Sequence, residues 1–423
     1  MKNVLILDDD SEISKIPFHS CFSEGEARLF LITQCPDKLE NLRPFYAKII
    51  ETNSLAGHGL VEYYTEQIFR QYGLDSLVNT VENLLLRSGR LRDQLNISGQ
   101  SYLSALLFRD KLLMRQHAAT AKIPVPHFCS VQTPIDILLF IRDYGYPVII
   151  KRTLGVASQG SYLVRNEANL LNFLKLYDAG KQFHERYGAY IVEQYIEGDV
   201  FHVNGFISHG QVCCIWPFVY YNSGLLYTTG IPTGYYPLSV KNPLTEPLIH
   251  FAHRVISSFP TPPDTFFHIE ILQSKNDELF LCEAASRRPG GLIMRMMDDM
   301  YGLAPPNVLF RTQVRQLAGL PPENEFAPYE SLDTESAKLR WRRPYGDLFV
   351  PVLPGILRRA PSICPIPDVV YSLVAKPGQT YRPADMWPRR AAHMIVYGDS
   401  EQAIRVRMAE AAEWFAAESQ WET

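Results

Sequence analysis

Two glutamates, Glu270 and Glu283, lie in a stretch of sequence whose pattern brings them together. The stretch contains two apolar runs, 266–272 and 279–285, separated by the polar residues SKND, which is typical of two strands joined by a tight turn. If Asn276 and Asp277 are the central residues of a two-residue turn, pairing runs outward from residues 275 and 278. This register places Glu270 directly opposite Glu283.

Directly opposed carboxylates need a partner. At a separation of about 5 Å and an effective dielectric constant of about 20, they repel each other by roughly 3 kcal/mol. A shared proton or a lysine could offset this repulsion, and paired carboxylate oxygens are also ligands that Mg²⁺ accepts. A register slip of one residue would instead place Glu283 on the opposite, solvated face. The hairpin alone leaves both interpretations open.

The residues after the second run add positive charge and flexible backbone. They read Ser286, Arg287, Arg288, Pro289, Gly290 and Gly291. Guanidinium groups followed by glycines suit a phosphate or carboxylate held close to the main chain. An ordinary basic turn would have the same composition.

A second informative stretch covers residues 145–164. The β-branched run Val148 to Ile150 ends in Lys151, and a loop with Gly155, Ser158 and Gly160 precedes another short strand. Small residues let backbone N–H groups approach phosphate oxygens, and a lysine supplies a point charge. The loop is not a Walker A motif, because no Gly-Lys-Ser/Thr opens a helix.

A helix is predicted over residues 105–119, from apolar residues at 105, 106, 108, 112 and 113. Arg109, Lys111 and Arg115 follow its polar side, and we interpret them as a solvated basic face. A later strand over 190–196 carries Glu193, which by itself is expected to be solvated. Residues 216–237 are dense in aromatic residues and glycines, as in a loop region that lines a pocket.

Composition limits the class of protein. The 423 residues, 46% hydrophobic and 20% charged, suffice for two or three globular domains. A net charge of −4 argues against nucleic acid or an anionic membrane as partner. The seven cysteines form no Cys-x-x-Cys pair, which indicates reduced thiols rather than disulfides or zinc ligands. Without a long apolar segment, we expect a cytoplasmic protein.

The N-terminal residues predict the beginning of an α/β domain. Residues 3–7, NVLIL, followed by three aspartates from Asp8, predict a buried parallel strand that begins a doubly wound α/β domain. A response-regulator receiver is discarded, because residues 47–59 contain no phospho-acceptor aspartate, and no Gly-x-Gly-x-x-Gly supports dinucleotide binding.

Near the C-terminus we predict strands over 348–356, 369–375 and 393–396. A final helix, capped near Asp399 or Ser400, has an apolar stripe at Ile404, Met408, Ala411, Ala412 and Phe415.

Taken in order and spacing, five short motifs resemble the ATP-grasp superfamily, and within it carboxylate-amine ligases such as the bacterial L-amino acid ligases. They are RDK at 109–111, VIIKRTLGVASQG at 148–160, VEQYIEG at 192–198, HIEI at 268–271 and CEAASRRPGG at 282–291. The resemblance implies a mixed α/β and α+β fold. Its parts would be an N-terminal Rossmann-like domain (1–105), an ATP-grasp domain with a lid and a central antiparallel sheet (106–325, lid about 115–195), and a C-terminal α+β subdomain (326–423).

The resemblance also assigns roles to residues. Lys111 and Lys151 would hold the phosphates of ATP beneath a mobile glycine-rich loop, Gly155 to Gly160, which includes Ser158. Glu193 and Ile196 would contact adenine. Glu270 and Glu283 would bind Mg²⁺, and Arg287 would neutralise an acyl phosphate. On position alone, Trp216, Tyr220 and Arg295 are pocket candidates, and Gly290 and Gly291 are further substrate candidates. His268 shares the face of Glu270 and could contact substrate or metal, although a packed, hydrogen-bonded histidine is the commoner outcome.

Two positions depart from the family pattern. Val200 stands where an acidic residue often contacts ribose, so Asp199 and His202 become candidates for that contact. Ala285 stands where an asparagine often gives the metal another oxygen ligand. These departures put the ribose contact and the third metal ligand in doubt.

The activity implied by the resemblance is ADP-forming ligation of a carboxylate, with an amino acid as substrate, to an amine through an acyl phosphate. Two alternatives stay open: transfer of the acyl group to a carrier-protein thiol, and a nucleotide-binding protein without catalysis. The expected partners are small-molecule substrates, with an acyl carrier protein and a homodimer kept as further options. Neither nucleic acid nor membrane is expected as a partner.

Overall fold

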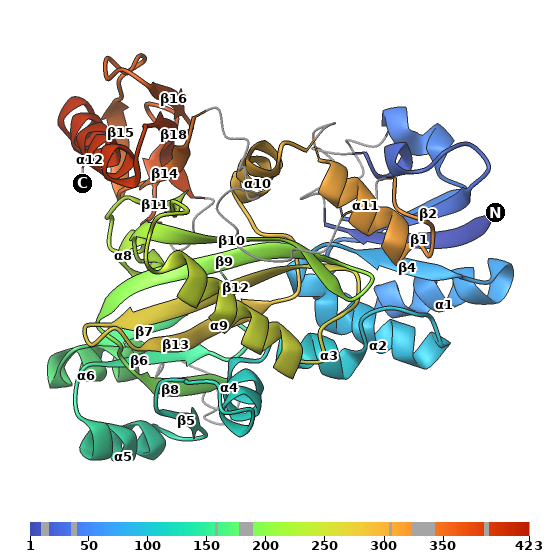
Figure 1. Ribbon diagram of the computed structural model, residues 1–423, viewed down its shortest axis with the longest axis horizontal. Coiled ribbons are helices and arrows are strands. Elements are labelled where there is room, and N and C mark those ends of the chain that lie inside the picture. Colours follow the sequence, from blue (N-terminus) through green and yellow to red (C-terminus); the bar gives the residue numbers. More distant parts are fainter. Residues whose placement is uncertain are drawn as a thin grey trace.

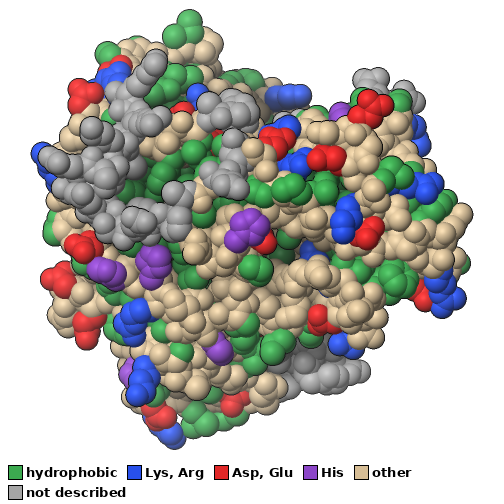
Figure 2. Space-filling view, turned by 45° about the vertical axis from the view of Figure 1, so that its right-hand side comes forward, with side chains coloured by type: hydrophobic (Ala, Val, Ile, Leu, Met, Phe, Trp, Pro, Cys, Tyr) green, Lys and Arg blue, Asp and Glu red, His purple; other side chains and the backbone are tan. Residues whose placement is uncertain are grey.

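The computed structural model describes residues 1–9, 17–34, 40–156, 160–176, 189–303, 307–323, 326, 343–384 and 389–422. Within these ranges the strands form four sheets: an N-terminal sheet, a small sheet within residues 128–194 that we call the lid sheet after its expected role, a large central sheet, and a three-stranded sheet near the C-terminus (Figure 1). No helix in these ranges combines the length and the apolar character that crossing a membrane requires. On the face drawn in Figure 2, acidic and basic side chains lie interspersed.

The N-terminal sheet is parallel, in the order β3-β2-β1-β4. Its strands are β1 (Lys2–Asp8), β2 (Ala27–Thr33), β3 (Lys48–Glu51) and β4 (Ser76–Asn79). The predicted first strand is confirmed, and its residues Val4 to Leu7 are completely buried because helices cover both faces of the sheet. Short 3₁₀ turns are η1 (Phe18–Cys21), η3 (Glu40–Phe45) and η4 (Glu82–Leu84).

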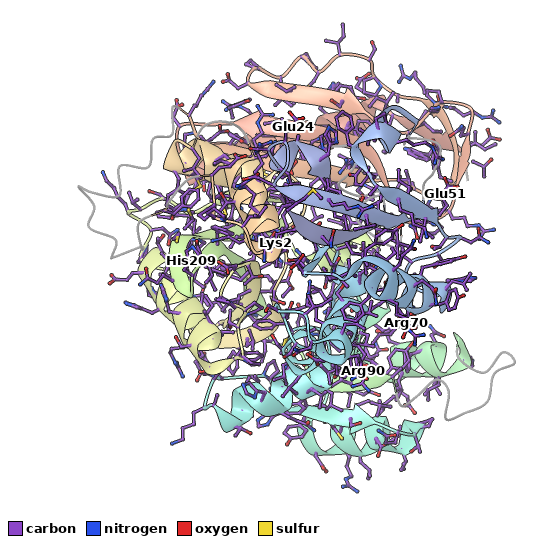
Figure 3. All side chains as sticks on the ribbon, turned by 90° about the vertical axis from the view of Figure 1, so that its right-hand side faces the viewer. Lys2, Glu24, Glu51, Arg70, Arg90 and His209 are labelled. Atoms are coloured by element: carbon purple, nitrogen blue, oxygen red, sulfur yellow. The ribbon has the colours of Figure 1, made fainter. Side chains whose placement is uncertain are left out.

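Helices from distant parts of the sequence cover this sheet. One face packs against α1 (Leu60–Tyr72) and α2 (Leu85–Leu95), whose Arg70 and Arg90 lie at the surface in Figure 3. The other face packs against Phe310 and Val314 of α11 (Val308–Leu317). Although α11 falls within the range 106–325 expected for the central domain, it therefore covers the N-terminal sheet.

The lid sheet is antiparallel, in the order β5-β8-β6-β7. Its elements are β5 (Phe128–Val131), α5 (Pro134–Tyr144), β6 (Val148–Arg152), β7 (Ser161–Val164), α6 (Glu167–Leu176) and β8 (Tyr190–Gln194). The single helix predicted over 105–119 is wrong: α3 (Tyr102–Leu107) and α4 (Lys111–Thr120) are separate. The Asp110 carboxylate breaks the run, because it accepts hydrogen bonds from the backbone N–H groups of Leu112 and Leu113 and so begins a new helix.

The central sheet has eight antiparallel strands, in the order β13-β12-β9-β10-β11-β14-β18-β16. They are β9 (Gly198–Ser208), β10 (Gln211–Asn222), β11 (Thr233–Pro237), β12 (Thr265–Ser274), β13 (Leu279–Ala285), β14 (Tyr345–Pro351), β16 (Val369–Leu373) and β18 (Arg390–Tyr397). Helices α8 (Gly224–Tyr227), α9 (Thr245–Ser258) and α10 (Ile293–Tyr301) accompany it. Three strands of the C-terminal region therefore extend the central sheet.

The strand predicted over 348–356 is interrupted. β14 ends at Pro351, and β15 (Gly355–Arg359) joins a separate small sheet with β17 (Thr380–Tyr381) and β19 (Gln420–Glu422). The last helix, α12 (Glu401–Glu418), is capped by Ser400, whose hydroxyl accepts a hydrogen bond from the N–H of Ala403. The predicted apolar stripe is the buried face of this helix.

Candidate active site

The predicted pairing of Glu270 with Glu283 is confirmed, although the turn beside it differs from the prediction. The loop has three residues, closed by the hydrogen bond from Ser274 N–H to the Glu278 carbonyl, with Asp277 in the left-handed region at φ +61°. Continued unchanged, that register would place Glu270 opposite Cys282. A β-bulge shifts the pairing by one residue, because Cys282 is an extra residue between the pairs Glu270–Glu283 and Ile271–Leu281.

Each acid of the pair has its own partner. Glu270 accepts a hydrogen bond from the Tyr220 hydroxyl at 2.7 Å and lies 3.6 Å from His268 Nε2. Burial raises the pKa of Glu270, but His268 and Tyr220 outweigh that effect and lower the pKa to about 2. Glu283 accepts from Lys111 Nζ at 2.8 Å. Each glutamate therefore accepts from a donor of its own, and the lowered pKa of Glu270 keeps that side chain a carboxylate.

A row of polar side chains continues from Glu270 across the same face of the sheet. His268 Nδ1 lies 2.7 Å from the side-chain oxygen Oδ1 of Asn204, and the side-chain Nδ2 of Asn204 donates to His202 Nδ1 at 2.7 Å. Burial lowers the pKa of His202 well below its ordinary value, so the ring is neutral. Sequence reasoning missed Asn204. Its signal was the alternation of polar residues at 202 and 204 within an otherwise apolar strand.

The predicted solvated basic face of the helix is wrong. Arg109, Lys111 and Arg115 are 4%, 6% and 0% exposed. Lys111 and Arg115 are buried because α4 packs against β5 of the lid sheet and β13 of the central sheet, and Arg109 lies just before this helix. Arg115 donates to the carbonyl of Cys282 at 2.6 Å. Lys111 Nζ also donates to the Gly155 carbonyl at 2.9 Å, so it links the start of the glycine-rich loop to the acid pair.

Glu193 forms a second buried ion cluster, rather than the solvated strand residue expected without the resemblance. Its carboxylate lies 2.6 Å from Arg115 Nε and 2.5 Å from Lys151 Nζ. Burial raises the pKa of Glu193, but the two cations outweigh that effect and lower the pKa to about 2. Lys151, from β6, is thereby fixed beside Glu193.

The remaining nucleotide candidates occupy different surroundings. Ile196 is half-buried in the connection between β8 and β9, and Asp199 is exposed on β9. Gly160 has φ +72°, a backbone conformation that favours glycine. Ser158 lies outside the described residues.

Arg287 belongs to a third ion cluster that joins separate parts of the chain. Its Nε donates to Glu82 at 2.7 Å, and Arg109 donates to the other oxygen of Glu82 at 2.7 Å. Burial raises the pKa of Glu82, but Arg287 and Arg109 outweigh it and lower the pKa to about 2. Arg109 also donates to the carbonyl of Leu154, next to the glycine-rich loop. Sequence reasoning missed Glu82, because only the fold brings it to Arg287.

The other substrate candidates divide by exposure. Trp216 is completely buried, and its indole N–H donates to the carbonyl of Leu238 at 2.9 Å, which makes it a core residue without surface for a substrate. Arg295 on α10 and the two glycines Gly290 and Gly291 are exposed. His268 is 8% exposed and belongs to the polar row.

The acid pair fits a hard cation that takes few protein ligands. Within the described ranges, no three His, Cys, Asp or Glu side chains converge as a metal cluster. Two opposed carboxylates, one with a pKa of about 2, match the way Mg²⁺ binds through one or two carboxylates together with waters and substrate phosphates.

A family model and several solved structures of known proteins resemble this chain. Residues 144–296 match the family model of an ATP-grasp domain. The whole chain superimposes on the L-amino acid ligase from Bacillus licheniformis with a TM-score of 0.64 and 15% identity, covering 100% of this chain and 99% of that one. Residues 144–296 therefore form an ATP-grasp domain. The mixed α/β and antiparallel architecture expected from the sequence is thus confirmed.

Two further comparisons bear on the kind of protein that carries this domain. The L-arginine-specific L-amino acid ligase of Bacillus subtilis is 25% identical over 238 residues, 56% of this chain and 57% of that protein. The match thus spans little more than half of that relative's length. N5-carboxyaminoimidazole ribonucleotide synthetase from Thermotoga maritima superimposes with a TM-score of 0.64 and 16% identity over 98% of both chains.

Proposed function

We propose that this ATP-grasp protein is an ADP-forming ligase that joins a carboxylate to an amine, with an amino acid among its substrates. The observation that carries the proposal is the contact between Lys111 and Glu283. It brings helix α4 and strand β13 of the central sheet to one point. A cation suited to nucleotide phosphates and an acid suited to a metal ion therefore share one site. Similarity to two L-amino acid ligases supports the choice of substrate class.

The residues have distinct tasks in this proposal. Lys111 and Lys151 bind the phosphates of ATP, while Glu270 and Glu283 hold Mg²⁺. Held by these two carboxylates, Mg²⁺ would supply positive charge that stabilises phosphoryl transfer. Tyr220 and His268 keep Glu270 ionised and oriented through their contacts with its carboxylate.

Two steps then make the amide. An oxygen of the substrate carboxylate takes the terminal phosphoryl group of ATP, and ADP leaves. The amine nitrogen next attacks the carbonyl carbon, phosphate leaves, and the nitrogen loses a proton. Arg287 offers its guanidinium to the phosphorylated carboxylate, and the glycine-rich loop keeps water from this reactive group.

The charge of the site suits an anionic substrate. Five cations face four carboxylates: Arg109, Lys111, Arg115, Lys151 and Arg287 against Glu82, Glu193, Glu270 and Glu283. The net charge of this set is therefore +1. This excess positive charge can meet negative charge of the nucleotide phosphates or of a substrate carboxylate.

One screen tests the proposal. ADP release is measured with ATP and Mg²⁺ over pairs of amino acids and small carboxylic acids. We expect at least one pair to give ADP together with an amide product. Glu283→Ala should lower that rate by roughly 100-fold or more, because the charge stabilisation of the transferring phosphoryl group is lost. Glu278→Ala, in the exposed turn of the same hairpin, is the matched control. ADP formation at the normal rate in Glu283→Ala would refute the assigned chemistry.

The two alternatives predict other products. Transfer to a carrier-protein thiol would give a thioester, and an acidic carrier would dock on arginines of the C-terminal region. Two of these, Arg343 and Arg358, already pair with Asp368 and Glu422. A protein that only binds nucleotide would give no hydroxamate when hydroxylamine is added with ATP and candidate acids. Hydroxamate without amide, with holo-carrier required for turnover, would favour the thioester.

A further inference from the structure

The segment from Ser286 to Leu292, here called the 286–292 segment, connects β13 to α10 and is held at both ends by carboxylates from elsewhere. At its beginning, Glu82 binds Arg287. At its end, Asp347 of β14 accepts a hydrogen bond from the Leu292 N–H at 3.1 Å. Figure 1 shows α10 between the C-terminal strands and α11, which lies on the N-terminal sheet.

Asp347 is the centre of a buried hydrogen-bond cluster that the proposed mechanism does not use. It is completely buried, and one of its oxygens accepts from the Tyr235 hydroxyl at 2.6 Å. The other oxygen lies 2.5 Å from His393 Nε2. The Tyr235 hydroxyl in turn accepts from the Leu292 N–H at 2.8 Å. A buried carboxylate needs such partners, because leaving it without them is costly.

The backbone of the segment is shaped to reach this cluster. Gly291 has φ +64°, and a Cβ atom there would lie 2.0 Å from the Tyr235 hydroxyl and 3.1 Å from the Asp347 carboxylate. Only glycine allows the main chain to come this close. The approach of the segment to Asp347 is therefore built into the sequence at Gly291.

The sheet register connects this cluster with the acid pair. Tyr220 pairs with Tyr235, and Tyr235 pairs with Asp347, so the three side chains project from the same face of the sheet. Tyr220 also donates to Glu270. One row of side chains thus runs from the C-terminal strand β14 to the proposed metal site.

We propose that Asp347 and Glu82 are positioning residues that fix the 286–292 segment from both sides, so that the N-terminal and C-terminal parts of the chain jointly place Arg287. The catalytic consequence rests on the proposed function, whereas the positioning itself does not. A substrate carboxylate bound beside Arg287 would then depend on Asp347, which lies in a different part of the chain. This gives strand β14 a task in substrate placement.

Amide hydrogen exchange of the nucleotide-free, full-length protein tests the positioning without any activity. The Leu292 N–H should exchange slowly in the wild type, and roughly tenfold or more faster in Asp347→Ala, because one of its two acceptors is lost and the other, the Tyr235 hydroxyl, loses the carboxylate that orients it. Asp347→Asn keeps an acceptor oxygen and should retain most of the protection. The control is Asp368→Ala, which removes a carboxylate of the C-terminal region that pairs with Arg343. Unchanged exchange at Leu292 in Asp347→Ala would overturn the proposal.

A milder variant covers the case in which Asp347→Ala fails to fold. Tyr235→Phe removes only the hydroxyl that bridges Leu292 and Asp347, and it should also raise Leu292 exchange. If Tyr235→Phe folds and leaves Leu292 exchange unchanged, the cluster does not hold the segment.

Steady-state kinetics then test the consequence for catalysis. In Asp347→Ala and Glu82→Gln, we expect a several-fold increase of KM for the carboxylate substrate, while ATP affinity stays within twofold of the wild type. A purely structural role would change both together. If the wild type ligates no substrate pair, the proposed function fails, and the exchange experiment still decides the positioning. Equal losses in ATP and carboxylate binding would contradict the proposed substrate placement.

Discussion

Replacing Glu193 by glutamine tests whether buried charges hold the lid sheet against α4. Glu193 is 1% exposed and contacts both Arg115 and Lys151, and Arg115 is completely buried. Glutamine keeps the shape of the side chain but removes its charge. Two buried cations then lose their counter-ion, and the free energy of unfolding should fall.

Two routes give the size of the loss. Breaking a buried ion pair by removing one partner costs about 3–5 kcal/mol. Independently, Arg115 and Lys151 overcome the effect of burial and lower the pKa of Glu193 from 4.5 to about 2. By linkage this difference corresponds to about 3 kcal/mol at neutral pH. We therefore expect Glu193→Gln to lower the free energy of unfolding by about 3–4 kcal/mol.

The same linkage fixes the pH dependence. A carboxylate with a lowered pKa in the folded state contributes its full stability above the unfolded pKa, and loses it as the pH falls through the folded pKa. For Glu193 this window runs from 4.5 down to about 2. The wild type should lose this contribution there, while the glutamine variant, which has none to lose, should show a flatter pH dependence.

Urea unfolding at pH 7, followed by tryptophan fluorescence, measures the loss. The control is Glu66→Gln, which removes an exposed ion pair with Arg70 on α1 and should cost less than about 1 kcal/mol. ATP should restore part of the stability of Glu193→Gln if its phosphates supply charge to Lys151. A Glu193→Gln variant as stable as the Glu66 control would refute the reasoning that this carboxylate neutralises two buried cations.

Three further predictions address other parts of the chain. Gly291→Ala should destabilise the protein by about 1–3 kcal/mol through the clash with Tyr235. Gly378→Ala, with open space around its Cβ position and a similarly positive φ, isolates the backbone strain in thermal unfolding. Burial raises the pKa of Asp298 to about 6. Stability should therefore fall as the pH rises from about 4 to about 6, and Asp298→Asn should be about 2–3 kcal/mol more stable at pH 8 by urea unfolding. Trp216→Phe should lower stability by about 1–3 kcal/mol without changing KM, so a changed KM at unaltered stability would contradict its place in the core.

Local sequence patterns predicted much of the architecture. The buried run at 3–7 gave the first parallel strand, and the spacing of apolar residues after Ser400 gave the buried face of the last helix. Such features depend on neighbours along the chain, so sequence periodicity reveals them. The Glu270–Glu283 pairing was also predicted, but from a two-residue turn. The actual three-residue turn and the bulge at Cys282 each shift the register, and their effects cancel.

Predictions about burial of charge failed for a different reason. Arg109, Lys111 and Arg115 read as a solvated helix face, because charged residues at helical spacing usually face water. Their partners are Glu82, Glu283 and Glu193, which belong to three different elements. No local pattern connects these residues.

By itself, the sequence determined the types and order of the chemical groups: paired acids, lysines beside a glycine-rich loop, and an arginine that precedes two glycines. Only the tertiary structure decided which charges neutralise one another. It also decided that Glu82 and Asp347 contact the two ends of one segment. The physical reason is that a buried charge is tolerable only beside a partner. Long-range packing chooses that partner, whereas the spacing of residues along the chain does not.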